Sequence, residues 1–238
     1  MNSAGPTMYS SALAQWQRIV LGAVVSPAAA WMEAMDMANR LIAVDRNGSW
    51  GYTCKGLLQV NAVGPYKQGG VDLIDEALAN LNTAYELNPH HILNLLALCY
   101  GENAAGHSDS AIRYAFHALR ISPLDPQRFI INHHLSTANL ALSEYASSES
   151  FARLGISEAP GFALLRVNRA MSLVGLREFQ AANAEFQEAK RLWPQFVERA
   201  LVGAVVYRNP EHASRFTRLL RTAAKLERFD LETSVSRP

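Results

Sequence analysis

The chain has 238 residues, of which 49% are hydrophobic and 18% are charged, and its formal net charge is +1. This apolar content excludes a disordered chain, and the near-neutral charge argues against broad electrostatic binding to nucleic acid. The longest apolar run, residues 19–30, contains Pro27 and is shorter than the ~20 residues that cross a bilayer, so no membrane span is expected.

Apolar residues at helical spacing predict antiparallel helix pairs along almost the whole chain. We expect a flexible leader at residues 1–8, one helical-repeat domain at residues 9–229 and a frayed tail at residues 230–238. Residues 64–70 are interpreted as an inserted loop. Residues 92–105 are apolar on nearly every side and are expected to form the most buried helix. The predicted pairs are 9–23 with 28–44, 50–63 with 72–87, 92–105 with 110–121, 127–142 with 145–155, 162–174 with 178–192, and 197–206 with 210–228.

The segment DLIDEALANLNTAYELNP at residues 72–89 is the unit that the rest of the chain repeats. Prolines end comparable segments at intervals of 34, 37 and 34 residues: Pro89, Pro123, Pro160 and Pro194. Small residues precede them at matching positions, such as Ala77 and Ala84, Ala111 and Ala118, and Ala182 and Ala189. This pattern resembles the tetratricopeptide repeat (TPR), a helix–turn–helix unit. The resemblance implies an all-α fold, a right-handed superhelical solenoid of antiparallel helix pairs.

The linkers between the predicted helices are similar to those of one bacterial group. NPHH at residues 88–91, SPLDP at residues 122–126 and YRNP at residues 207–210 look like linkers in the TPR regions C-terminal to winged-helix transcription activators and class III adenylate cyclases. This resemblance implies a cytoplasmic module of transcriptional or signalling regulation. The sequence contains neither a winged helix nor the cyclase carboxylates, so we expect either a regulatory fragment or a stand-alone interaction protein.

Motifs for catalysis and metal binding are absent from the sequence. There is no glycine-rich phosphate loop after a strand, no G-x-S-x-G and no H-E-x-x-H, so we expect no enzyme and no cofactor. Cys54 and Cys99 lie in apolar helical patterns and are interpreted as buried free thiols. Without a C-x-x-C or Cys/His spacing, no zinc site is expected. His134 lies on the apolar arc of its helix and is interpreted as a core histidine.

Polar residues on the first helices of two adjacent pairs form a candidate partner groove. In residues 127–142 they recur at steps of four, four and three, which places them on one face of the helix. First helices line the concave surface of TPR arrays, so the resemblance implies that these residues contact a ligand. The alternative interpretation is a solvated helix face. The candidate groove consists of Arg128, Asn132, His133, Ser136, Asn139, Arg166 and Arg169.

The last predicted helix has a candidate basic face, made of Arg215, Arg218, Arg221, Lys225 and Arg228. Leucines occupy the other side. A helix with one polar face is what the open end of a solenoid needs to cover its core. The alternative interpretation is a surface for an acidic partner or a phosphate backbone.

Two functions follow from this sequence. The first is a non-catalytic scaffold that holds a protein or peptide partner, possibly an acidic one, in its groove. The second is a sensor that binds a small anionic ligand and controls an attached output domain. Direct binding to nucleic acid or membrane is not expected, and the sequence gives no oligomeric state.

Overall fold

The computed structural model describes residues 26–61, 73–203 and 205–227, together with Ser11, Ala14, Trp16 and Arg18 of an earlier helix. Within these residues the chain is all-helical, without a strand. The predicted leader, the inserted loop at residues 64–70 and the predicted tail lie outside the described residues. The helices are α2 (Pro27–Val44), α3 (Ser49–Val60), α4 (Ile74–Leu87), α5 (Ile92–Ala105), α6 (Ser108–Ile121), α7 (Arg128–Ala141), α8 (Tyr145–Glu158), α9 (Ala163–Gly175), α10 (Phe179–Leu192), α11 (Pro194–Leu201) and α12 (Pro210–Ala223).

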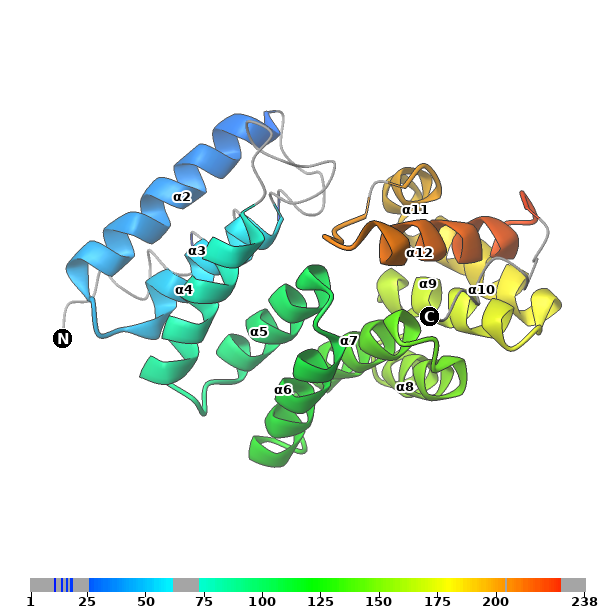
Figure 1. Ribbon diagram of the computed structural model, residues 1–238, viewed down its shortest axis with the longest axis horizontal. Coiled ribbons are helices and arrows are strands. Elements are labelled where there is room, and N and C mark those ends of the chain that lie inside the picture. The colour runs from blue at the N-terminus through cyan, green and yellow to red at the C-terminus, as the bar shows by residue number, and fades with distance from the viewer. Residues whose placement is uncertain are drawn as a thin grey trace, which may run out of the picture.

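Consecutive helices pack as antiparallel pairs, α3 with α4, α5 with α6, α7 with α8 and α9 with α10. The first helices also contact one another from pair to pair, in the order α3, α5, α7 and α9. In the described part of the chain the second helices lack comparable contacts with each other. The array is therefore curved, with the first helices in an inner layer and the second helices in an outer layer (Figure 1). This is an all-α solenoid of the TPR type, as the repeat pattern predicts.

Small residues at the helix crossings explain the close packing. The six alanines that the repeat pattern singles out are at most 1% exposed. A larger side chain at such a crossing would overpack the core. The prediction that residues 92–105 form the most buried helix is wrong: α5 and α7 each bury ten of their 14 residues, and α3 buries nine of its 12.

The turns inside three successive pairs share one geometry. Gly106, Ser143 and Arg177 have left-handed φ angles of 91°, 64° and 65°. In each turn the next N–H group donates at 2.8 Å to a carbonyl in the last turn of the first helix, as in a Schellman motif. These turns lie along one edge of the array. We call this the turn edge and define it by the start of α4 at residues 74–76, the end of α5 at residues 102–107 and the end of α7 at residues 139–143.

The last predicted pair differs from the structure. The helix predicted at residues 197–206 begins earlier, because Pro194 is favoured at the first helical position. It ends at Leu201, before Gly203, which has a left-handed φ of 83°. The helix predicted at residues 210–228 ends at Ala223, and Lys225 lies in the turn that follows.

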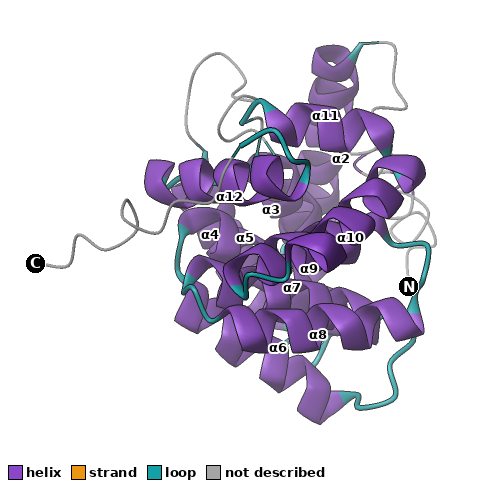
Figure 2. Cartoon of the chain, turned by 90° about the vertical axis from the view of Figure 1, so that its right-hand side faces the viewer, coloured by secondary structure: helices purple, strands orange, loops and turns teal. Residues whose placement is uncertain are grey.

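The position of α12 also differs from a simple continuation of the array. It packs on α9 more than on α11. In Figures 1 and 2 it lies on the side of α9 opposite to α8, over the inner layer. None of the described helices is both long enough and apolar enough to span a bilayer.

Gly56 provides a test of the close crossing of α3 and α4. A Cβ atom added there would lie 2.5 Å from Leu81 Cγ and 3.1 Å from the Ala77 carbonyl oxygen. We expect Gly56→Ala to lower the free energy of unfolding by about 1–3 kcal/mol, because the crossing cannot widen without losing its packing. Urea unfolding followed by circular dichroism measures this. Gly161→Ala is the control, since a Cβ atom there has no neighbour within 4 Å. Equal stability of both variants would contradict the prediction.

Candidate functional site

The polar stripe of α7 is largely buried. Asn132, Ser136 and Asn139 are 1%, 0% and 8% exposed, so the interpretation of these three as a solvated face is wrong. At the start of the stripe, Arg128 Nε donates to Glu158 Oε1 at 2.6 Å and Asn132 Nδ2 donates to Glu158 Oε2 at 3.1 Å. Asn139 Nδ2 donates to the Leu135 carbonyl oxygen within the same helix. The stripe therefore connects α7 to the end of α8.

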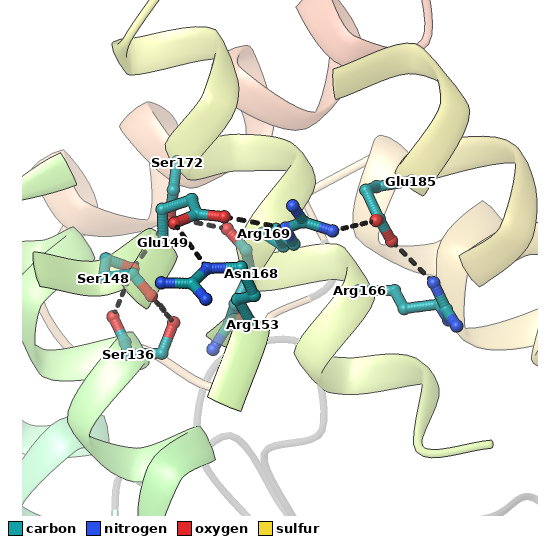
Figure 3. A network of polar contacts seen from close by, with 9 residues as sticks. All are labelled: Ser136, Ser148, Glu149, Arg153, Arg166, Asn168, Arg169, Ser172 and Glu185. Atoms are coloured by element: carbon teal, nitrogen blue, oxygen red, sulfur yellow. Dashed lines mark hydrogen bonds and ion pairs between the residues drawn. The ribbon is translucent and has the colours of Figure 1, made fainter. Parts of the chain in front are cut away.

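Three buried serines connect α7, α8 and α9 in the middle of the stripe (Figure 3). Ser136 Oγ donates to the Ser148 carbonyl oxygen at 3.0 Å, and Ser148 Oγ donates back to the Ser136 carbonyl oxygen at 2.8 Å. Ser172 Oγ lies 2.8 Å from Ser148 Oγ. A buried hydroxyl without a partner is costly, so these bonds favour one register of the three helices. They attach the serine-rich α8 although its sequence has few apolar residues.

The two candidate arginines of α9 lie between α8 and α10 (Figure 3). Arg169 Nε donates to Glu149 Oε1 at 2.9 Å, and its Nη1 donates to Glu185 Oε1 at 2.5 Å. Arg166 Nη1 donates to Glu185 Oε2 at 2.8 Å. The structure thus joins Arg166 and Arg169 through one carboxylate, whereas Arg128 and Asn132 share Glu158. The partner carboxylates could not be identified from the spacing of the polar stripe. Contact of the candidate groove residues with a partner stays a prediction.

The adjacent histidines of α7 are held neutral. His133 Nδ1 lies 3.2 Å from Asn168 Nδ2, and the carbonyl oxygen of the buried His134 accepts a hydrogen bond from Asn103 Nδ2 at 3.2 Å. Burial lowers the pKa of His133 to about 4. Burial, and then the neighbouring His133, lower the pKa of His134 well below its ordinary value. The interpretation of His134 as a core residue is confirmed by its 7% exposure. No cluster of three metal-ligating side chains exists among the residues that the structure describes.

The basic face of α12 is partly used by the array itself. Arg215 donates to the Ala141 carbonyl oxygen and, through Nη1, to Ser143 Oγ at 2.9 Å. Arg221 forms an ion pair with Glu227, and its Nη1 donates to the Leu201 carbonyl oxygen. Arg218 lies on the same helix, and Arg228 lies outside the described residues. Binding of an acidic partner or a phosphate backbone to this face stays a prediction.

The most informative site is one that the repeat pattern does not reveal. Residues 205–209 follow α11. They lie against the turn edge, at the start of α4 and the end of α5. The Arg208 N–H group donates to the Ala104 carbonyl oxygen at 2.8 Å. The Arg208 guanidinium donates to Asp75 Oδ1 and Oδ2 at 2.7 and 2.8 Å. These hydrogen bonds hold the pKa of the Asp75 carboxyl below its ordinary value. The only signal in the sequence is the YRNP motif, which was interpreted as a linker.

Apolar contacts complete this site. Val206 packs on a buried cluster that includes Val60, Ile74 and Leu98 of α3, α4 and α5. Tyr207 packs on the cluster around α9 and α12, with its ring centroid 4.7 Å from that of Phe216. Residues 205–209 therefore contact both halves of the array.

Comparisons with known proteins establish the fold. No protein-family model matches the chain, and no curated protein matches it. Among solved structures, the chain is similar to PilF of Pseudomonas aeruginosa, at 14% identity, over 94% of this chain and 89% of that chain, with a TM-score of 0.65. It is also similar to PilW, a type IV pilus biogenesis factor, at 13% identity, over 95% and 96%, with a TM-score of 0.65. A TPR protein of Thermus thermophilus matches at 14% identity, over 88% and 98%, with a TM-score of 0.59.

The α9 ion pairs predict a stability effect. We expect Arg169→Ala to lower the free energy of unfolding by about 1–3 kcal/mol, because the partly buried Glu149 loses its closest cation and Glu185 keeps only one of its two arginines, Arg166. Thermal or urea unfolding measures this. Arg153→Ala is the control, because Arg153 is exposed and lies 3.5 Å from the same Glu149. The expected change there is under about 0.5 kcal/mol. Equal effects of the two substitutions would show that the Arg169 contacts do not stabilise the fold.

The buried histidines predict a pH dependence. Their pKa values are depressed in the folded state, so unfolding lets them bind protons near their ordinary pKa of about 6.5. The stabilisation is fully present above that pH and is lost as the pH falls toward about 4. The slope is at most about 1.4 kcal/mol per pH unit for each histidine. Urea unfolding between about pH 6.5 and pH 5 measures it, and the double variant His133→Gln, His134→Gln should show a shallower slope. An unchanged slope would contradict this account.

Proposed function

We propose that this chain is a non-catalytic interaction module that binds a protein or peptide partner along the turn edge of its helical array. One observation carries this proposal: the array holds a non-helical segment there, its own residues 205–209. That segment is bound by a main-chain hydrogen bond, a two-pronged ion pair and an inserted apolar side chain. These are the contacts that a groove makes with a peptide in general.

The turn edge has a chemistry of its own because first helices end there. The last carbonyl groups of a helix have no partner within the helix. At the end of α5 the Ala104 carbonyl accepts from a main-chain N–H group, and at the end of α7 the Ala141 carbonyl accepts from Arg215. Acidic side chains, Asp75, Glu76 and the buried Glu102, lie at the same edge. These carboxylates and carbonyl oxygens accept hydrogen bonds from N–H groups and cations.

A bacterial, cytoplasmic and regulatory setting is the finer part of this proposal. Its support is the likeness of the three linkers to those of the TPR regions in winged-helix activators and class III adenylate cyclases. The second function, a sensor for a small anionic ligand, has less support. Its candidate ligands Arg166 and Arg169 already bind Glu185.

The test is a selection from a displayed random peptide library against the full chain. We expect selected peptides to bind at least tenfold more weakly to the variants Asp75→Ala and Glu76→Ala than to the parent chain, because both side chains lie at the turn edge. The control is Asp36→Ala, which removes an exposed carboxylate on α2 that pairs with Arg40. Titration by fluorescence anisotropy measures the affinities. Peptides that bind all four chains equally would show that the partner site lies elsewhere, and a selection without any binder would contradict the proposed function.

A further inference from the structure

The C-terminal segment, residues 205–223, consists of two parts that are held differently. α12 is the firmly held part. Its buried side chains Phe216, Leu219, Leu220 and Ala223 belong to the same core cluster as residues of α9 and α10. Asn183 Nδ2 also donates to the Ala223 carbonyl oxygen at 2.8 Å. Removal of α12 would expose this cluster, so α12 is a structural part of the fold.

Residues 205–209 are the weakly held part where they contact the N-terminal half of the array. The Arg208 and Asp75 side chains are 41% and 74% exposed. Water and salt screen an ion pair of this kind, so it contributes little stability. Val206 is only partly buried on its cluster. Val205 is buried and Tyr207 packs in the core cluster of α9 and α12, so these two residues stay with α12. Only the partly solvated contacts of Val206 and Arg208 with the N-terminal half open when the segment separates from the turn edge.

The backbone on both sides of residues 205–209 allows such a separation. On the N-terminal side, Gly203 has a left-handed φ of 83°, and Val202 is 79% exposed. On the C-terminal side, Asn209 Oδ1 accepts from the Glu211 N–H group at 2.9 Å, and Pro210 occupies the first helical position. The capping contacts of α12 lie within residues 209–212, so α12 keeps its start when Val206 and Arg208 leave the turn edge.

The surface beneath residues 205–209 selects for arginine. Asp75 receives one guanidinium N–H on each carboxylate oxygen, at 2.7 and 2.8 Å. A guanidinium has the planar fork for this geometry, and an ammonium group does not. Beside it the Ala104 carbonyl accepts the main-chain N–H group of the arginine itself. An apolar side chain two residues earlier fits the cluster that Val206 contacts.

We propose that residues 205–209, through Val206 and Arg208, cover the partner site from within the same chain, and that a partner displaces these two side chains with a segment that carries an arginine. This inference rests on the proposed function and names the partner chemistry and the regulation of the same site. The partner segment pairs its arginine with Asp75 and donates a main-chain N–H group to Ala104. In the free protein the apparent affinity for the partner equals the intrinsic affinity multiplied by the fraction of molecules in which Val206 and Arg208 have left the edge.

The first experiment measures the separation by hydrogen exchange of the full chain. In the parent, the Arg208 amide is protected by Ala104. We expect Arg208→Ala to raise exchange in residues 205–209 about tenfold, while exchange in α12 stays unchanged. The charge swap Asp75→Arg, Arg208→Asp should restore slow exchange, which a general loss of folding would not allow. Arg191→Ala is the matched control, because Arg191 makes an exposed two-pronged pair with Glu188 within α10. Unchanged exchange in Arg208→Ala, or faster exchange in α12 as well, would overturn the proposal.

The second experiment uses a fluorescent synthetic peptide with the sequence of residues 203–212. By anisotropy, we expect it to bind the Arg208→Ala chain about tenfold more tightly than the parent chain, because the site is open more often. The gain should vanish for the double variant Asp75→Ala, Arg208→Ala. It should also vanish for a peptide in which alanine replaces the arginine. Equal binding to parent and Arg208→Ala chains would overturn the proposal. A dimer of the Arg208→Ala chain in size-exclusion chromatography with light scattering would also overturn it, because the occupant would then be a second copy.

The outcomes separate this inference from the proposed function. If the synthetic peptide binds the edge as expected but library peptides ignore the turn edge, residues 205–209 are a removable cover and the proposed function fails. If library peptides bind the turn edge equally well in the parent and Arg208→Ala chains, the proposed function holds and the covering role fails.

Discussion

The close crossing of consecutive helices is the constraint on which the rest of this structure depends. Alanines with almost no exposure occupy the crossings, and at Gly56 even a methyl group would meet Leu81. Close contact among first helices, without matching contact among second helices in the described part of the chain, curves the array. The curvature leaves one face of α9 uncovered by the repeats. The apolar side of α12 covers that face, which is why the last helix turns back instead of extending the array.

The same geometry creates the turn edge. Each first helix must end before its pair can turn, and each ending leaves carbonyl groups without an intrahelical partner. Within the pair, the turn N–H groups satisfy the carbonyls of Glu102 and Asn139. Later carbonyls, at Ala104 and Ala141, accept from residues that are far away in sequence, Arg208 and Arg215. Repeated helix ends therefore produce a row of acceptors, and the chain supplies cations and amides to it from its own C-terminal segment.

The sequence predicted the fold to within a few residues, because the period of small residues and prolines reports local packing. The bounds of α5 and the pairings from α3 to α10 follow from that period alone. The polar stripe of α7 could not be interpreted correctly in the same way. Ser136 and Asn132 are polar and buried, and a pattern of residue types does not distinguish a buried hydrogen-bonded side chain from a solvated one. The Arg208–Asp75 contact could not be predicted from the sequence either, because it joins residues 133 positions apart.

The electrostatics of the two regions point to opposite ligands. Around α9, Arg166 and Arg169 bind Glu149 and Glu185 in partly buried pairs. An anion that bound these arginines would leave the partly buried carboxylates unpaired. The free-energy cost of that loss exceeds the free energy gained from an exposed contact with the anion. At the turn edge the roles are reversed: the acceptors are the exposed Asp75 carboxylate and the carbonyl oxygens of Ala104 and Ala141. A cationic segment gains contacts there without breaking a buried pair, since it competes with the exposed Arg208. Arg166 and Arg169 of the candidate partner groove therefore stabilise the array, whereas the exposed carboxylate at the turn edge belongs to Asp75.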